Sequence, residues 1–232
     1  MTAAPLLLGI DTCGPSGSVA LARAGGDQLE LLEQVELAGR TYSAMLVHTV
    51  RELLARHSVG LADLAALVVV AGPGSFTGVR VGLSAAKGLA GPADLPILAV
   101  SRLAVLATKA ETEAAALDAH RSEIFLRLSE SAAGAARELL AGAEELATQP
   151  APKSIAVCDA AASLLRATWS AVAQVVTDAP TAFDAIQVAL PRLMARQFDD
   201  VASLDGHYLR RSDAEIFGSP IAATTVKHPE SR

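Results

Sequence analysis

A glycine-rich loop is the segment that most limits how this chain can fold. Residues 72–82 read GPGSFTGVRVG, after an apolar run at residues 64–71 and before a small-residue helical pattern at residues 79–91. A strand, a glycine loop and a helix N-terminus in this order commonly hold an anion, because glycine accepts positive φ and the first helical N–H groups are free. The loop matches neither a Walker loop nor a dinucleotide fingerprint. Phosphate binding and a plain tight turn therefore both stay open at this point.

The composition favours a folded protein that does not hold nucleic acid by itself. The chain has 232 residues, of which 51% are hydrophobic, and it contains five Phe, two Tyr and one Trp. Its formal net charge is −6. Binding a nucleic-acid backbone requires clustered basic residues, and binding single strands requires stacking aromatic residues. The sequence has neither pattern, and its core is expected to be aliphatic.

The cysteines and the N-terminal segment favour a cytoplasmic protein. Cys13 and Cys158 lie far apart and form no metal-binding spacing, which is typical of a reduced chain. The first residues carry no positive charge ahead of the short apolar block, so no secretory signal is predicted. The longest apolar run has about half of the ~18–20 residues needed to cross a bilayer, so no membrane association is expected.

Apolar runs separated by turn signals predict a mixed α/β chain. The expected strands cover residues 6–11, 18–23, 28–37, 64–71, 96–100, 114–118, 124–128 and 154–159. The expected helices cover residues 41–57, 79–91, 102–109, 160–170 and 181–198. Ser101 is expected to cap the third of these helices, and Pro191 is expected to kink or split the last one.

A repeated pattern predicts two similar lobes. Asp11 and Asp118, 107 residues apart, each end a strand that is followed by a polar turn and another strand. A repeat of this size indicates a domain duplication, with lobes at residues 1–110 and 111–232. Two carboxylates across a cleft could hold Mg²⁺ or act as an acid–base pair, or each could simply cap its own turn. The turn after Asp118 contains no glycine, so the second lobe is not expected to hold a nucleotide.

The two helices next to the glycine loop suggest a docking face. One side of the first helix is apolar, and the second helix carries small residues at every fourth position. Glycine inside a helix costs roughly 0.5–1 kcal/mol relative to alanine, so the small residues need a compensating close approach. The neighbour could be the chain's own sheet or a helix of another subunit. No metal site is predicted, because none of the five histidines lie at a metal-binding spacing.

The loop sequence GPGSFTGVRVG closely resembles the hallmark of the TsaB family. Three weaker matches follow in the family's order, LGIDT at residues 8–12, LDAHRSEIF at residues 117–125 and YLRRSDAE at residues 208–215. The resemblance implies the duplicated α/β fold of actin, Hsp70 and sugar kinases, with two RNase H-like lobes. It implies a non-catalytic dimerisation subunit for the synthesis of threonylcarbamoyladenosine in tRNA.

The partners that the resemblance implies are a TsaD-type catalytic subunit and a TsaE-type ATPase, with tRNA reached only through the complex. A homodimer is an alternative to these pairings. No cofactor is required by this chain itself, although ATP and Mg²⁺ could act within the complex. The residues 210–215 are expected to close the fold.

A sugar-kinase-type phosphotransferase is the main alternative function. A metallopeptidase fits less well, because residues 41–57 lack the closely spaced histidine pair of the catalytic relatives and have Tyr42, Leu46 and His48 there instead.

The resemblance and the residue patterns together give two sets of candidate site residues. The phosphate-loop remnant consists of Asp11, Thr12, Gly72, Gly74, Ser75, Thr77 and Gly78. The partner interface consists of Tyr42, Met45, Leu46, Val50, Leu53, Gly78, Gly82, Ala86 and Ala90. No catalytic residue is assigned.

Overall fold

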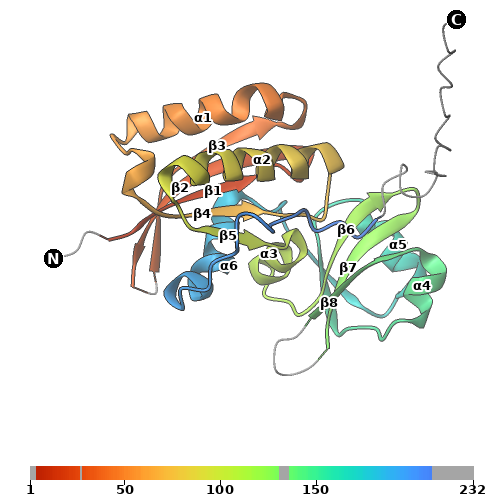
Figure 1. Ribbon diagram of the computed structural model, residues 1–232. Coiled ribbons are helices and arrows are strands. Elements are labelled where there is room, and N and C mark those ends of the chain that lie inside the picture. The colour runs from red at the N-terminus through yellow and green to blue at the C-terminus, as the bar shows by residue number, and fades with distance from the viewer. Residues whose placement is uncertain (1–3, 27, 131–135, 211–232) are drawn as a thin grey trace, which may run out of the picture.

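The protein consists of two α/β lobes, each built around a mixed five-stranded sheet (Figure 1). A computed structural model describes residues 4–26, 28–130 and 136–210. The C-terminal part of the expected closing segment, residues 211–215, lies outside the described residues. Since ligands of such folds sit between the lobes, the arrangement of the two sheets decides where a site can form.

The first sheet has the strand order β3-β2-β1-β4-β5. Its strands are β1 (Leu6–Asp11), β2 (Ser16–Gly25), β3 (Gln28–Ala38), β4 (Leu64–Val70) and β5 (Ile97–Val100). The first three strands form an antiparallel meander, and β4 and β5 run parallel to β1. The central strands β1 and β4 are almost completely buried, which explains why they are continuous apolar runs rather than alternating ones.

Helices cover both faces of the first sheet. They are α1 (Tyr42–Arg56), α2 (Phe76–Ala93) and α6 (Ala182–Met194), with single 3-10 turns at Gly39–Thr41 and Leu61–Asp63. Helices α1 and α2 pack side by side on one face, and α6 crosses the other face beneath β1, β2 and β4 (Figure 1). The core of this lobe therefore lies in two layers on either side of the sheet.

The second sheet has the corresponding strand order, β8-β7-β6-β9-β10. Its strands are β6 (Ala115–His120), β7 (Glu123–Ser129), β8 (Ala136–Ala141), β9 (Ser154–Val157) and β10 (Ala173–Val176). Its helices are α3 (Arg102–Lys109), α4 (Ala143–Thr148) and α5 (Ala161–Thr168). Successive residues of β6 point to opposite faces: Ala115 and Leu117 pack with α3, and Ala116 packs with α5.

The common strand order of the two sheets confirms the predicted duplication, but the lobe boundary differs from the prediction. Helix α6 was placed in the second lobe, residues 111–232, whereas Ala182, Ala185 and Ile186 lie in the core of the first. The chain crosses back so that α6 covers the face of the first sheet opposite α1 and α2, where it contacts β1, β2, β4 and β5.

Most predicted strands and helices are confirmed, while β8, α4 and β10 were not predicted. Ser101 caps α3 as expected, since its hydroxyl oxygen accepts hydrogen bonds from the backbone N–H groups of Leu103 and Ala104. Pro191 does not split α6, which continues through it and ends at Met194. Proline inside a helix removes one hydrogen bond, and α6 ends three residues after Pro191.

Candidate functional site

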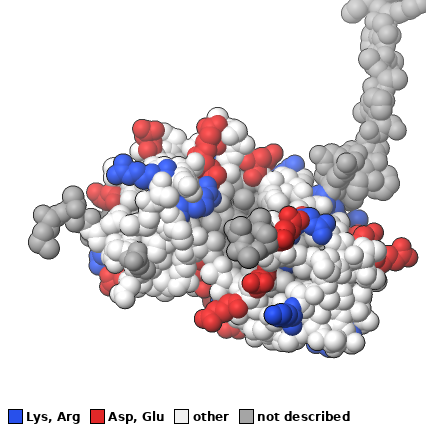
Figure 2. Space-filling view, turned by 90° about the horizontal axis from the view of Figure 1, so that it is seen from below, with Lys and Arg blue, Asp and Glu red and all other residues white. Residues whose placement is uncertain are grey.

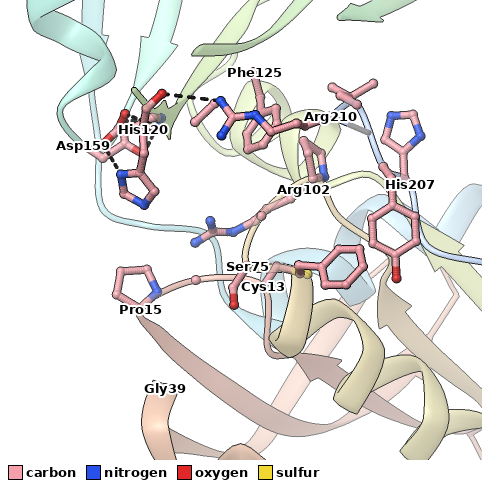
Figure 3. A pocket seen from close by; sticks show the side chains of 18 of the residues that line it. Cys13, Pro15, Gly39, Ser75, Arg102, His120, Phe125, Asp159, His207 and Arg210 are labelled. Carbon is pink, nitrogen blue, oxygen red and sulfur yellow. Dashed lines mark hydrogen bonds and ion pairs between the residues drawn. The ribbon is translucent and has the colours of Figure 1, made fainter. Parts of the chain in front are cut away.

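A cleft of about 940 Å³ lies between the two lobes (Figure 3). The turn after β1 and the glycine loop at residues 73–76 form its wall in the first lobe, and Arg102, the first residue of α3, lines it where the chain passes from one lobe to the other. The β6–β7 turn and Asp159, after β9, form its wall in the second lobe. Residues 207–210, which follow α6, also line it. A pocket of this volume between lobes is large enough for a small organic ligand.

The glycine loop packs directly against the chain segment that follows β1. A β carbon added at Gly78 would lie 2.0 Å from the carbonyl oxygen of Thr12, and one added at Gly74 would lie 2.3 Å from that of Cys13. The hydroxyl of Thr12 donates a hydrogen bond to the carbonyl of Gly78, at 2.7 Å, and the N–H of Ser75 donates to the carbonyl of Cys13, at 2.8 Å. The glycines therefore allow the loop to lie on its own chain.

The predicted phosphate-loop residues do not form one open site. Gly74 and Ser75 line the cleft, and the side chain of Ser75 caps α2 by accepting from the N–H of Gly78. Gly72 has φ +113° and leads into a cis peptide bond with Pro73. The other predicted members do not line the cleft: Asp11, Thr12, Gly72 and Gly78 are buried, and Thr77 is exposed.

Asp11 is buried beside Arg102. One carboxylate oxygen of Asp11 accepts a hydrogen bond from the N–H of Cys13, at 2.8 Å, as an aspartate that caps its turn does. The other oxygen has no hydrogen-bond partner and lies 3.9 Å from Nε of Arg102, which also has none. Burial raises the pKa of Asp11, and the positive charge of Arg102 opposes that rise. Asp11 therefore serves the turn and a buried ion pair, and it is closed off from the cleft.

Asp118 repeats the turn of Asp11 in the second lobe. Its carboxylate accepts a hydrogen bond from the N–H of His120 at 2.8 Å, and its other oxygen lies 3.1 Å from Nδ1 of the same histidine. Asp159 accepts hydrogen bonds from the N–H groups of Asp118 and Ala161. Unlike Asp11, both aspartates line the cleft, and both are engaged by donors of their own lobe.

The turn after Asp118 has an unusual backbone. His120, Arg121 and Ser122 all have positive φ, between 56° and 61°, although none of them is glycine. The pairing of His120 with Glu123 makes Arg121 and Ser122 the two central residues of a tight hairpin turn. Arg210 holds this turn, because its guanidinium group pairs with Glu123 and donates to the carbonyl of His120. This contact agrees with the predicted closing role of the C-terminal segment, as far as that segment is described.

A buried carboxylate ties the two lobes together next to the cleft. Glu138, on β8, accepts hydrogen bonds from Ser101 at the start of α3 and from Arg127 on β7. It also bonds the ring of His207 at 2.8 Å. Burial alone would raise the pKa of Glu138, but the hydrogen bonds from His207, Ser101 and Arg127 together hold it below its ordinary value. This cluster joins the first lobe, the second lobe and the chain after α6.

The predicted partner interface is largely internal in this chain. Of the α1 residues in that set, Tyr42, Leu46, Val50 and Leu53 are buried in the core of the first lobe. They pack there because α1 must cover β2, β3 and α2 with its apolar side. The small residues Gly78, Gly82, Ala86 and Ala90 are buried as well.

The contact at Gly82 shows why the small residues point inward. A β carbon at Gly82 would lie 2.4 Å from the hydroxyl oxygen of Thr12, so the absence of a side chain here lets Thr12 pack against α2. Leucine at this position is therefore expected to destabilise the monomer itself.

The outer surface of the same two helices has a different composition. Met45 is 41% exposed and Val47 is 57% exposed, both on α1. Gly88 and Gly91 of α2 would each place a β carbon in open space. We call these four residues the outer α1–α2 face. His48 is exposed on α1 and contacts Arg51, with 3.4 Å between the two nitrogen atoms.

Arg102, Glu138 and His207 were not identified from the sequence. Arg102 was assigned only as the first residue of a helix, and nothing local indicates that its charge is buried. Across the parts of the chain that the structure describes, no cluster of three or more metal-ligating side chains occurs, and no helix is long and apolar enough to cross a membrane. On the face shown in Figure 2, acidic and basic side chains are interspersed among uncharged ones.

The two lobes define the class of this protein. Their common strand order, with a ligand-sized cleft between them, is that of the actin-like fold with two RNase H-like lobes, which confirms the predicted fold class. A family profile described as TsaD, tRNA N6-adenosine threonylcarbamoyltransferase, matches residues 33–203. The chain belongs to this family, and within it to the TsaB (YeaZ) group.

Individual relatives support the same placement. The protein is 41% identical over 125 residues to the tRNA threonylcarbamoyladenosine biosynthesis protein TsaB of Haemophilus influenzae, covering 51% of each chain. It is 36% identical to the Escherichia coli TsaB over the same length, covering 51% of this chain and 52% of that one. These matches span about half the length of the curated relatives.

The solved structure of YeaZ from Pseudomonas aeruginosa extends the likeness to the whole fold. It superposes with a TM-score of 0.72 at 26% sequence identity, covering 88% of this chain and 100% of that one.

Proposed function

We propose that this protein is a non-catalytic partner subunit of a TsaD-type threonylcarbamoyltransferase and supports the formation of threonylcarbamoyladenosine next to the anticodon of tRNA. Its relatives TsaB of Haemophilus influenzae and Escherichia coli are described as threonylcarbamoyladenosine biosynthesis proteins. The proposed setting is the cytoplasm, with a TsaE-type ATPase joining the assembly and supplying its ATP and Mg²⁺ chemistry. Contact with tRNA is made through the complex.

The observation that carries this proposal is the outer α1–α2 face. Gly88 lies inside α2, where glycine costs roughly 0.5–1 kcal/mol relative to alanine, and no atom of the described residues lies within 4 Å of the place that a β carbon would take. Another helix that packs closely over Gly88 and Gly91 would use that space. A partner that also covers an exposed apolar side chain of α1, such as Val47, would gain about 25 cal/mol per Å² of apolar area buried.

The contacts of the glycine loop support a non-catalytic role. In a sugar-kinase-type phosphotransferase the loop would leave its N–H groups to a phosphate. Here the carbonyl of Cys13 accepts the N–H of Ser75, and the carbonyl of Thr12 fills the space beside Gly78. A phosphate in that place would meet carbonyl oxygens instead of donors, which disfavours the phosphotransferase alternative.

The proposal is tested by reconstituting tRNA modification from purified parts. TsaD-type and TsaE-type subunits of the same organism are mixed with threonylcarbamoyl-adenylate and tRNA, with and without this protein, and the modified adenosine is counted by mass spectrometry. The expected result is that modification requires this chain, and that the chain alone modifies nothing. Equal modification without the chain would overturn the proposal, and modification by the chain alone would show that it is catalytic.

A further inference from the structure

The guanidinium group of Arg102 is buried but has no hydrogen-bond partner among the described residues. Arg102 is 5% exposed, and its one ion pair is the 3.9 Å approach to Asp11. Its Nε atom is fully buried without a hydrogen bond. A buried charged group ordinarily has its donors satisfied, because leaving them unpaired costs several kcal/mol. Because Arg102 lines the cleft and its guanidinium group has no hydrogen-bond partner among the described residues, its donors are available to a ligand there.

The guanidinium group of Arg102 projects into the cleft between the lobes. Figure 3 shows it between Pro15 and Ser75 on one side and His120 and Asp159 on the other. Gly14 makes room for it, because a β carbon at that position would lie 2.4 Å from Nη2 of Arg102. The backbone of Arg102 is also held in place, since its N–H donates to the carbonyl of Gly72 at 2.6 Å. The group is thus held in place with donors directed at the cleft.

Several other charged groups of the cleft are engaged. The carboxylates of Asp118 and Asp159 accept backbone N–H groups of the second lobe. Arg210 pairs with Glu123, and His207 bonds Glu138. None of these pairs uses Arg102. The carboxylate of Asp11 balances the charge of Arg102, but the 3.9 Å between its Oδ2 and Nε of Arg102 is too long for a hydrogen bond.

A helix N-terminus lies on the same cleft. Gly74, Ser75 and Phe76 at the start of α2 line it, and the positive end of this 18-residue helix favours a negative charge nearby. Arginine pairs with planar or tetrahedral oxyanions through two parallel hydrogen bonds. We propose that the cleft between the lobes binds a small molecule through an oxyanion group, a phosphate or a carboxylate, which Arg102 anchors.

This site differs from the phosphate site predicted for the glycine loop, because backbone carbonyl groups of Thr12 and Cys13 fill that predicted site. It goes beyond the proposed scaffold role and does not rest on it, because binding would occur in the isolated protein. The volume of about 940 Å³ is larger than a free anion needs, so the oxyanion would be one end of a larger molecule.

The test is an NMR titration of the full chain that follows the Nε–H signal of Arg102. The probes are inorganic phosphate, adenosine monophosphate and acetate, each added at constant ionic strength, and Arg102→Lys identifies the signal by removing it. The expected result is a saturable shift with at least one probe. Stronger binding of adenosine monophosphate than of acetate would identify a phosphate ligand, and the reverse order would identify a carboxylate ligand.

Two variants of Ser75 give a matched control that keeps the fold. Aspartate and asparagine both cap a helix as serine does, so Ser75→Asp and Ser75→Asn should preserve α2. Only Ser75→Asp adds a negative charge to the cleft, and it should weaken binding about tenfold relative to Ser75→Asn, as expected for two like charges a few ångströms apart. The absence of a saturable shift with all three probes, or equal affinity of the two variants, would overturn the proposal.

Discussion

Two glycines of α2 should respond to the same substitution in opposite ways. Gly82 and Gly88 both lie inside the helix, and each carries the same intrinsic cost relative to alanine. At Gly82, the methyl group of alanine would lie 2.4 Å from the hydroxyl oxygen of Thr12, which is fixed by its hydrogen bond to the carbonyl of Gly78. At Gly88, the methyl group would meet no atom within 4 Å.

The expected free energies follow from these contacts. Gly88→Ala should stabilise the isolated protein by roughly 0.5–1 kcal/mol, because it only removes the cost of glycine in a helix. Gly82→Ala gains the same amount but forces a steric overlap into a packed region, which typically costs about 1–3 kcal/mol. Its net effect is a destabilisation of up to about 2.5 kcal/mol, which lowers the melting temperature by up to roughly 10 °C in a chain of this size.

The measurement is urea unfolding followed by circular dichroism, with Thr12→Ala as a third variant. Removing the hydroxyl of Thr12 costs a hydrogen bond but opens space for the new methyl group. The double variant Thr12→Ala/Gly82→Ala should therefore be more stable than the sum of the single effects predicts, by more than about 0.5 kcal/mol. Additive effects, or a stabilising Gly82→Ala, would refute the inward packing of this glycine.

Two further predictions concern pH. The pKa of Glu138 is lower in the folded protein than its ordinary value of 4.5, so its stabilising effect is present above pH 4.5 and is lost as the pH falls through the folded pKa. The test is urea unfolding of Glu138→Gln and the wild type at a series of pH values. The variant should be less stable at pH 7, and its free energy of unfolding should fall less below pH 4.5. An equal slope of the free energy of unfolding against pH in the two proteins would contradict this. Burial raises the pKa of Tyr42 from 10.0 to about 12, and its hydroxyl donates to the carbonyl of Gly14. Tyr42→Phe should cost about 0.5–1.5 kcal/mol at pH 7 and should lose less stability than the wild type between pH 10 and pH 12, which the same unfolding series checks; parallel curves would count against it.

The central strands and long helices could be predicted from the sequence because the spacing of their apolar residues shows which of their faces are buried. Strand β4 is an uninterrupted apolar run, and α1 carries its apolar residues at helical spacing. The strand β10 has only four residues, and β8 mixes charged with apolar residues, so neither shows a period that distinguishes it from a loop.

The orientation of small residues could not be predicted in the same way. Gly78, Gly82 and Gly88 look alike in the sequence. Gly78 and Gly82 pack against Thr12, whereas Gly88 has no neighbouring atom within 4 Å of the position of a β carbon. Which side of a helix faces the sheet depends on contacts between segments about 70 residues apart. The predicted interface residues of α1 and α2 are therefore mostly buried inside the first lobe, and whether these helices bind a partner stays a prediction.

Arg102 shows the same limit for the cleft. In the sequence it is a charged first residue of a short helix, a position that is usually solvated. Its burial results from Gly14, Asp11 and the second lobe closing around it, and only the three-dimensional structure brings these together.

The most direct test of the account asks whether the outer α1–α2 face carries the partner. Val47→Glu places a charge on this face, and Val176→Glu places the same charge on β10 at a site that is 74% exposed, so neither should disturb the core. Binding to the TsaD-type subunit is measured by calorimetry, and adenosine modification is measured in the same samples. The account predicts that Val47→Glu weakens binding at least tenfold and lowers modification in proportion, while Val176→Glu does neither. Equal binding by the two variants would contradict it.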